Sequence, residues 1–373
     1  MITIKEASTK RDLKKFADFP TRLYRDCPYY VPPIRINELK LANPKKNPSG
    51  KNCRAKYWLA YKGGKLAGRV SAIINGLDDR KTGLRRVRFC RIDFIDDREV
   101  SRTLMNAVED FAKKEGRRDI IGPLGFNDLD REGLLIEGFD RMSTFETQYN
   151  YPYYKTHLED LGYVKEIDSE EILYTVPKVH DERISRIAQK ALEKYDFRIL
   201  EGMSKRRLIK LYGEKAFRML DECYSALFCT VPLTGEAIKS TLGSFGLIAR
   251  LEMMCFVADK DGNVVAGAIA LPSIADAVRK SRGRLTPFSI LRIIRAVRRP
   301  KTVDLVLIGV LPAYRNYGLS AVIIDRVLRG IVASGATLAE SNPLLETNDK
   351  IHAQFTFTDG EVVRRRRFYK KCL

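Results

Sequence analysis

The clearest pattern of apolar and polar positions in this chain lies in residues 302–330. Residues 303–310 form a short β-branched, apolar run, which predicts a buried strand. The chain then breaks at Leu311 and Pro312, and a basic turn containing Gly318 follows. Beyond it, apolar residues recur at spacings of three and four, which predicts a helix with one apolar face: Ala321, Ile324, Val327 and Leu328. A helix that starts this way has unpaired N–H groups at its first turn, which can bind a phosphate group.

The N-terminal half has the pattern of a sheet flanked by helices. Residues 1–4 alternate as a strand, and Ser8 and Thr9 precede a helical pattern. Two strand patterns surround Gly63 and Gly64, which predicts a hairpin. The remaining predicted elements are a strand at 86–95, a helix at 98–114, a strand at 119–123 and a strand at 172–176.

The C-terminal half repeats this order. Helices are predicted at 184–195, 205–223 and 235–242, with a short strand at 197–200. A hairpin turns at Asp261-Gly262-Asn263. After the helix that follows Gly318, we expect a strand at 336–339, a helix through about residue 355 and a last strand at 362–369. The pattern therefore predicts an α+β (mixed α/β) protein of two similar lobes, residues 1–178 and 179–373, each a mixed, mostly antiparallel twisted sheet flanked by helices.

Net charge is the unusual bulk property. The 373 residues include 67 Lys and Arg against 47 Asp and Glu, a formal net charge of +20. This excess favours polyanionic partners such as the phosphates of a nucleotide, nucleic acid or anionic lipid, and it is equally consistent with a solubility effect. The seven cysteines are scattered without metal-ligand spacing, so no metal site is predicted. No apolar run is long enough to cross a bilayer and the first residues lack a signal peptide's apolar core, so we expect a soluble cytoplasmic protein.

Residues 276–301 are strongly basic, with Asp276 as the one acid. Within this insertion, residues 287–299 predict an amphipathic helix with arginines on one face and four apolar residues on the other: Ile290, Ile293, Ile294 and Val297. The basic part, residues 279–301, suits contact with an anionic membrane, with nucleic acid or with an acyl chain under a lid. A helix that packs on the sheet and exposes a solvated basic face is the alternative. Residues 364–367 and 370–371 likewise give the last strand basic surroundings, or alternate as solvent-facing charge.

The motif V-x-P-x-Y-R-x-x-G-x-S that starts at Val310 resembles motif A of the GNAT superfamily, the acetyl-CoA-dependent N-acyltransferases. The order of elements and the whole length of the chain are similar to a two-lobed subgroup of that superfamily. The resemblance implies acetyl-CoA or another acyl-CoA as cosubstrate, with the pantetheine arm on the strand edge and the pyrophosphate on the turn. It implies these cofactor-binding residues: Val310, Leu311, Arg315, Asn316, Tyr317, Gly318, Leu319, Ser320 and Asn348.

The corresponding place in the first lobe has a different chemistry. Residues 94–101 include Asp96 and Asp97 at the predicted helix start, where carboxylates accept hydrogen bonds from the first N–H groups. Two carboxylates would also repel a pyrophosphate. We therefore predict that the first lobe lacks the pyrophosphate-binding loop and that the second lobe alone holds the cosubstrate.

An acid-rich, loop-rich stretch follows in the first lobe, at residues 123–140. Asn127, Asp128 and Glu137 are the candidates there for recognising a cationic or hydroxylated acceptor, because carboxylates suit an amine. A long connector with solvated acids is the alternative. The predicted acceptor is a small-molecule or peptide amine.

Acyl transfer to an amine requires a base for the amine, donors for the oxyanion and a proton for the departing thiolate. The resemblance places Glu340, at the end of the strand after the motif A helix, as the candidate base and Asp304 as the second choice. The tyrosine that the family often uses as acid is absent from the following helix, which offers His352 instead. Tyr317 and Tyr369 are the candidate substitutes.

Two functions of different class follow from these observations. The first is an acyl-CoA-dependent N-acyltransferase that acetylates or acylates an amine. The second is a non-catalytic, GNAT-derived binding or regulatory protein that engages lipid or nucleic acid through residues 279–301. The intact strand, turn and helix favour the first, and the missing acid favours the second. The oligomeric state cannot be predicted from this sequence.

Overall fold

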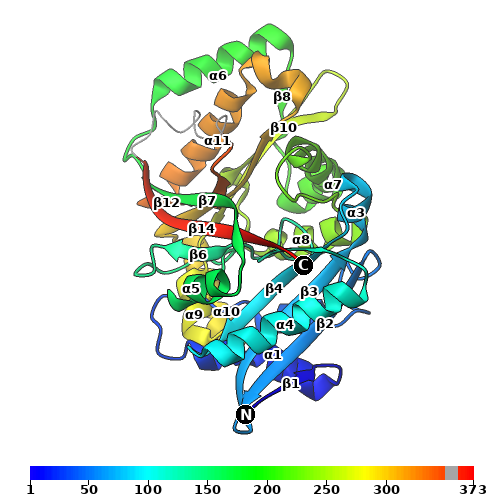
Figure 1. Ribbon diagram of the computed structural model, residues 1–373. Coiled ribbons are helices and arrows are strands. Elements are labelled where there is room, and N and C mark those ends of the chain that lie inside the picture. The colour runs from blue at the N-terminus through cyan, green and yellow to red at the C-terminus, as the bar shows by residue number, and fades with distance from the viewer. Residues whose placement is uncertain (349–359) are drawn as a thin grey trace.

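A large mixed sheet runs through the whole protein. The computed structural model describes residues 1–348 and 360–373, and Figure 1 shows the helices arranged on both faces of the sheet. Within the described residues the strand order is β1-β2-β3-β4-β5-β14-β7-β12-β11-β10-β9-β8, with β6 beside β14 and β13 beside β7. In the described part of the chain, no helix is long and apolar enough to cross a membrane.

The N-terminal half forms the first part of this sheet. Its elements are β1 (Ile2–Glu6), α1 (Lys10–Leu23), α2 (Arg35–Leu41), β2 (Cys53–Lys62), β3 (Lys65–Asn75), α3 (Gly76–Thr82), β4 (Arg86–Phe94), α4 (Arg98–Lys114), β5 (Asp119–Gly122), β6 (Leu134–Glu137), α5 (Tyr153–Asp160) and β7 (Val164–Thr175). The hairpin predicted around Gly63 and Gly64 is confirmed as β2 and β3. Helix α4 packs on this antiparallel sheet through Val100, Leu104 and Val108, against Val70 and Phe94 among others.

The C-terminal half forms the second part. Its elements are α6 (Glu182–Tyr195), β8 (Arg198–Ile199), α7 (Lys205–Tyr224), α8 (Gly235–Ile248), η1 (Leu251–Met253), β9 (Met254–Ala258), β10 (Val264–Pro272), α9 (Ala275–Ser281), α10 (Pro287–Arg298), β11 (Thr302–Val310), η2 (Pro312–Tyr317), α11 (Leu319–Ala333), β12 (Leu338–Ser341), β13 (Leu344–Leu345) and β14 (Gly360–Cys372). Helices α6 and α11 cover one face of this part of the sheet, and α7 and α8 cover the other. The predicted strand and helix on either side of Gly318 are confirmed as β11 and α11.

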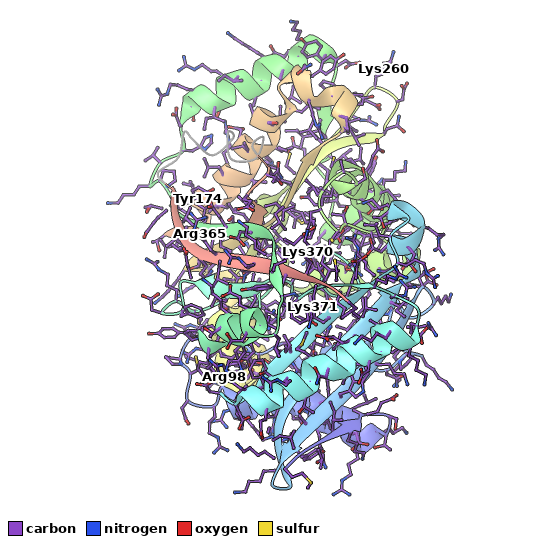
Figure 2. The ribbon with its side chains drawn as sticks, in the orientation of Figure 1. Arg98, Tyr174, Lys260, Arg365, Lys370 and Lys371 are labelled. Atoms are coloured by element: carbon purple, nitrogen blue, oxygen red, sulfur yellow. The ribbon has the colours of Figure 1, made fainter. Side chains whose placement is uncertain are left out.

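The two halves exchange their last strands. Strand β14 lies between β5 and β7, and β7 in turn pairs with β12 of the C-terminal half. Figure 1 shows β14, in red, crossing the middle of the molecule, and Figure 2 labels Arg365, Lys370 and Lys371 along it. Strands from before and after residue 178 therefore belong to one continuous sheet. The division into two lobes at residue 178 stays a prediction.

A buried ion-pair cluster holds β14 against β7. Arg364 and Arg366, on β14, are essentially inaccessible, and both guanidinium groups bind the buried Glu171 of β7. Burial alone would raise the pKa of Glu171, but Arg366 and Arg364 hold it below its usual value. The main-chain oxygens of Met142 and Gln148 accept further hydrogen bonds from the two arginines. Two of the arginines in residues 364–367 are thus buried and paired, and they do not form an alternating solvent-facing row.

We expect Glu171→Ala to lower the free energy of unfolding by about 3–5 kcal/mol, because it removes the carboxylate that both buried guanidinium groups share and leaves Arg366 without an ion-pair partner among the described residues. Urea denaturation measures this. Glu137→Ala is the matched control, since Glu137 forms an exposed ion pair with Arg365 on the same strand, and it should change stability by about 1 kcal/mol or less. Equal effects of the two substitutions would contradict the structural role given to Glu171.

Candidate functional site

Strands β11 and β12 separate about halfway along β11. They pair in parallel only between Thr302–Leu305 and Leu338–Ser341, although β11 continues to Val310 alongside β10. After Ser341 the chain turns towards β7, where β13 pairs. From Val306 onward, no described strand covers the β12 side of β11. Beyond Leu305, side chains bond to the main chain of β11: the Val306 carbonyl accepts a hydrogen bond from the Asn342 amide at 3.4 Å, and Ile308 is bonded to Tyr224.

A cavity of about 700 Å³ occupies this opening. It reaches both faces of the sheet, because residues of α6 and α11 line it from one side and residues of α7 and α8 line it from the other. Strand β7 contributes Tyr174, labelled in Figure 2. Most of the lining is aliphatic or aromatic, and α11 presents a row of five aliphatic side chains to it: Ile323, Ile324, Val327, Leu328 and Ile331. Such a lining suits an alkyl chain.

Carboxylates from the N-terminal half line the same cavity. Asp128 accepts a hydrogen bond from the Val231 N–H at 3.3 Å, and Glu132 accepts one from the Gly125 N–H at 3.1 Å. Burial raises the pKa of Asp128 to about 7, against the opposing effect of Arg88. Burial, together with the charge of Asp128, raises the pKa of Glu132 well above its usual value. At neutral pH Glu132 therefore holds its proton, and Asp128 can accept one.

Glu146 is a further acid at the cavity wall. Burial raises its pKa to about 7, with Arg131 acting in the opposite direction. Asp130 also lines the cavity, but it is committed to an ion pair with Arg91 at 2.9 Å. Among the described cavity-wall residues, the groups with pKa values near neutrality are therefore Asp128 and Glu146, and these are the candidates for accepting a proton.

Tyr224 provides a hydroxyl at the strand edge exposed by the opening. It lies at the end of α7 and lines the cavity. Its hydroxyl accepts a hydrogen bond from the Ile308 N–H at 2.9 Å and donates one to the Ile308 carbonyl at 2.8 Å. Burial raises the pKa of Tyr224, so the hydroxyl keeps its proton. It is thus a proton or hydrogen-bond donor placed at the main chain of β11.

The turn between β11 and α11 lies just beyond the cavity. Gly318 has φ +75°, in the left-handed region, and caps α11 without a side-chain hydrogen bond or an acid in the first turn. At the start of α4, by contrast, the Asp97 carboxylate accepts hydrogen bonds from the N–H groups of Glu99 and Val100. The predicted carboxylate cap at the start of α4 is confirmed. The start of α11 fits a phosphate group, and the start of α4 is already occupied by a carboxylate.

The cofactor-binding residues predicted from motif A lie along this path. Val310 and Leu311 are half-buried against the core cluster that includes α11, whereas Arg315 and Asn316 are exposed on η2. Leu319 is buried and Ser320 is half-buried in the first turn of α11. Asn348 lines the cavity. The helix predicted after Asn348, with His352, lies outside the described residues.

The candidate catalytic residues from sequence do not line the cavity in the described structure. Ala339 and Ser341 do, and because alternate residues of a strand point to opposite faces, Glu340 points away. Glu340 forms an ion pair with Arg364. Asp304 is buried beside it on β11, and burial raises its pKa to about 7. The geometry favours other groups over these two as the base.

Tyr317, the third candidate, lies in an aromatic cluster outside the cavity. Its ring packs edge-on against Tyr195 at 4.7 Å between centroids and near Phe197 and Tyr314. Tyr369, the other tyrosine considered, is buried in the core of the N-terminal half and bonds to Glu159. Neither ring is among the described residues at the cavity wall.

Of the predicted acceptor-binding residues, the structure brings Asp128 alone to the described cavity wall. The Asn127 side chain bonds to the Leu129 N–H and to Ser49, and Glu137 is exposed beside Arg365. Glu132 lies within the acidic stretch at residues 123–140 that the sequence singles out, whereas Glu146 and Tyr224 were not predicted. No local pattern marks either residue, because each reaches the cavity through packing between distant segments.

No family model matches this chain. Protein YghO of Escherichia coli K12 is 28% identical over 376 residues, covering 97% of this chain and 93% of that protein. The bacterial ceramide synthase of Caulobacter vibrioides is 25% identical over 316 residues, covering 83% and 80%.

Among solved structures, a tandem GNAT protein from the clavulanic acid biosynthesis pathway, solved without acetyl-CoA, superposes with a TM-score of 0.56 at 10% identity, covering all of this chain and 98% of that one. A GCN5-related N-acetyltransferase from Sphaerobacter thermophilus superposes with a TM-score of 0.53 at 12% identity, covering 100% and 95%. The predicted fold is therefore confirmed: the chain has a tandem GNAT, acyltransferase-like fold.

Proposed function

We propose that this protein is an acyl-CoA-dependent N-acyltransferase that joins a medium- or long-chain acyl group to the amine of a lipid-like acceptor. The observation that carries the proposal is the apolar cavity through the opening between β11 and β12, with buried carboxylates in its wall. Its volume of about 700 Å³ lies within the range of about 300–1,000 Å³ that ligand pockets occupy. An acetyl group alone would leave most of this apolar space unfilled.

The binding path for the cosubstrate follows from the strand and the turn. The open edge of β11 suits an extended chain of amide groups, and the uncapped first turn of α11 suits a pyrophosphate, with Arg315 exposed nearby. The thioester of an acyl-CoA supplies an activated acyl group with a thiolate leaving group. The apolar row on α11 would receive the alkyl chain.

The acceptor class rests on the cavity wall and on one relative. The Caulobacter relative is named a ceramide synthase, and a ceramide is the amide of a fatty acid with a long-chain amino alcohol. The cavity combines an aliphatic lining with acidic side chains, which suits an acceptor with both an alkyl chain and an amine. We therefore propose a long-chain amine or amino alcohol as acceptor.

The residues divide the proton transfers between them. Asp128, with Glu146 as the second candidate, accepts a proton from the acceptor amine as the new C–N bond forms. The Tyr224 hydroxyl proton leaves its hydrogen bond to the Ile308 carbonyl and passes to the sulfur as the C–S bond breaks, and the Ile308 N–H stabilises the phenolate that remains. The products are the amide and the free thiol.

A base of this kind gives the rate a defined pH dependence. Because Asp128 must be ionised to accept a proton, kcat/KM should rise as pH increases through about 7, the value to which burial raises its pKa. Asp128→Asn should remove that rise and lower kcat/KM by about 100-fold or more. The exposed Glu137→Gln is the control and should keep the wild-type profile. An unchanged profile in Asp128→Asn would assign the base to another group, and Glu146→Gln is the next variant to measure.

The activity itself is tested by incubating the purified protein with decanoyl-CoA and a long-chain amino alcohol such as sphinganine. The proposal expects the amide, detected by mass spectrometry, in equal amount to the thiol released. Thiol release without amide would mean hydrolysis, and the absence of both across a panel of long-chain amines would favour the non-catalytic alternative.

A further inference from the structure

Helix α10 exposes large apolar side chains to solvent. The exposed fractions are 76% for Phe288, 46% for Ile290, 62% for Leu291 and 41% for Ile294. Leu285, just before the helix, is 52% exposed. Leaving this much aliphatic surface in water is costly, and a contiguous exposed patch of this kind marks an interaction surface.

The opposite side of α10 is packed, so the exposed face is not a sign of a loosely held helix. Ile293 and Val297 contact a cluster formed with Ile34, Ile274 and Val278. Thr286 and Ser289 form a capping box at the start of the helix. Of the four residues on the predicted apolar face, Ile293 and Val297 thus pack against this cluster, whereas Ile290 and Ile294 are exposed.

Arginines accompany the exposed apolar residues. Arg284, Arg292, Arg295, Arg298 and Arg299 are all exposed, and within the described residues none of them has an ion-pair partner. With about 3.6 residues per turn, Ile290, Leu291 and Ile294 fall on one outward strip. Arg292, Arg295 and Arg299 fall on the strip beside it. In α9, by contrast, Arg279 and Lys280 are both paired with Asp276.

We propose that α10 docks on the surface of an anionic phospholipid bilayer. An apolar strip beside a row of arginines is what an interfacial helix requires: the aliphatic groups enter the acyl boundary, and the guanidinium groups reach the lipid phosphates on flexible stems. The protein's net charge of +20 adds long-range attraction to such a surface. The exposed aliphatic residues carry the choice of lipid over nucleic acid, because a phosphate backbone offers them no apolar partner.

This surface adjoins the cavity wall. Phe145 and Ile248 pack in the same cluster as Ile293 and Val297. Their neighbours Glu146 and Phe245 line the cavity. A protein docked through α10 would thus hold the cavity close to the bilayer, where lipid-like substrates are found. The docking itself does not depend on transferase activity, so the two proposals fail separately.

The test is co-sedimentation of the full chain with two kinds of vesicle, one of phosphatidylcholine alone and one of phosphatidylcholine with about 30 mol% phosphatidylglycerol. We expect binding to the anionic vesicles only. Leu291→Ser should weaken the partition coefficient by about tenfold, and Arg292→Glu with Arg295→Glu by about 30-fold or more. The matched controls are Ile187→Ser on α6, where Ile187 is 57% exposed, and Arg206→Glu with Arg207→Glu, exposed on α7.

The outcomes separate cleanly. Loss of binding in the α10 variants with binding kept in the controls supports the proposal. Failure of the wild type to bind anionic vesicles overturns it, as does equal loss in the two charge-reversal variants, which would mean attraction by net charge alone. Tight binding to duplex DNA that Leu291→Ser leaves unchanged, with no vesicle binding, would also overturn it and assign the arginines to nucleic acid.

Discussion

Replacing Gly318 by tryptophan is expected to weaken the binding of coenzyme A by at least about 100-fold. The residue has φ +75°, a conformation that costs a non-glycine residue about 1–2 kcal/mol, and an added Cβ would lie 3.0 Å from the Cβ of Ala191. The turn must then move, and the indole covers the N–H groups at the start of α11. Losing two charge-assisted hydrogen bonds of about 1.5–3 kcal/mol each gives the stated factor. Isothermal titration calorimetry with coenzyme A measures it.

The control for Gly318→Trp is Gly335→Trp. Gly335 follows the other end of α11, also has a left-handed φ of +76°, and has nothing within 4 Å of an added Cβ. It reproduces the backbone strain and the added indole without touching the turn. If both variants bind coenzyme A alike, whether as well as the wild type or equally poorly, the phosphate site is not at the start of α11.

Tyr224→Phe is expected to lower kcat by about 100- to 1,000-fold, the usual range for loss of an acid or of an oxyanion donor. The phenyl ring still fills the cavity wall, but the group that bonds to both the N–H and the carbonyl of Ile308 is gone. The affinity for the acyl donor should change far less than kcat, because the ring packing is retained.

Tyr212→Phe is the matched control for this variant, since Tyr212 lies on the same helix outside the described lining of the cavity. A role of Tyr224 confined to packing would give a lower melting temperature with kcat preserved. A loss of kcat with unchanged melting temperature and unchanged coenzyme A affinity is the result that assigns it to the reaction.

Much of the fold could be predicted because its signals are local. The apolar run of β11, the left-handed glycine after it and the periodicity of α11 lie in one short stretch, and each reports on its own neighbours. The same holds for the Asp97 cap of α4, where the carboxylate and the N–H groups it binds are two and three residues apart.

The exchange of β7 and β14 could not be predicted, since strand pairing across some 200 residues leaves no local pattern. Arg364 and Arg366 look like surface charge in the sequence, and they become a buried core only when β14 lies on Glu171. Glu340 illustrates the consequence. Its position after the motif A helix suggested a base, but the alternation of β12 points it away from the cavity, and the exchanged strand β14 brings Arg364 to it.

The cavity was likewise beyond sequence reasoning. Asp128, Glu146 and Tyr224 come from three loops or helix ends that meet at the opening between β11 and β12. Asp128 was a candidate from the sequence, but the pKa shifts of Asp128 and Glu146 arise from the burial that this meeting creates, so their chemistry could not be predicted from spacing.

The central claim is that the cavity between β11 and β12 holds the alkyl chain of an acyl-CoA. It is tested most directly by titrating the protein with acetyl-CoA and decanoyl-CoA, for the wild type and for Ala268→Leu, a buried cavity-wall position on β10. Ala266→Leu, buried on the same strand but outside the described lining, controls for overpacking. We predict that the wild type binds decanoyl-CoA at least about 100-fold more tightly than acetyl-CoA, and that Ala268→Leu alone reduces this preference by about tenfold. Equal affinity for the two thioesters, or no saturable binding of either, would contradict the claim.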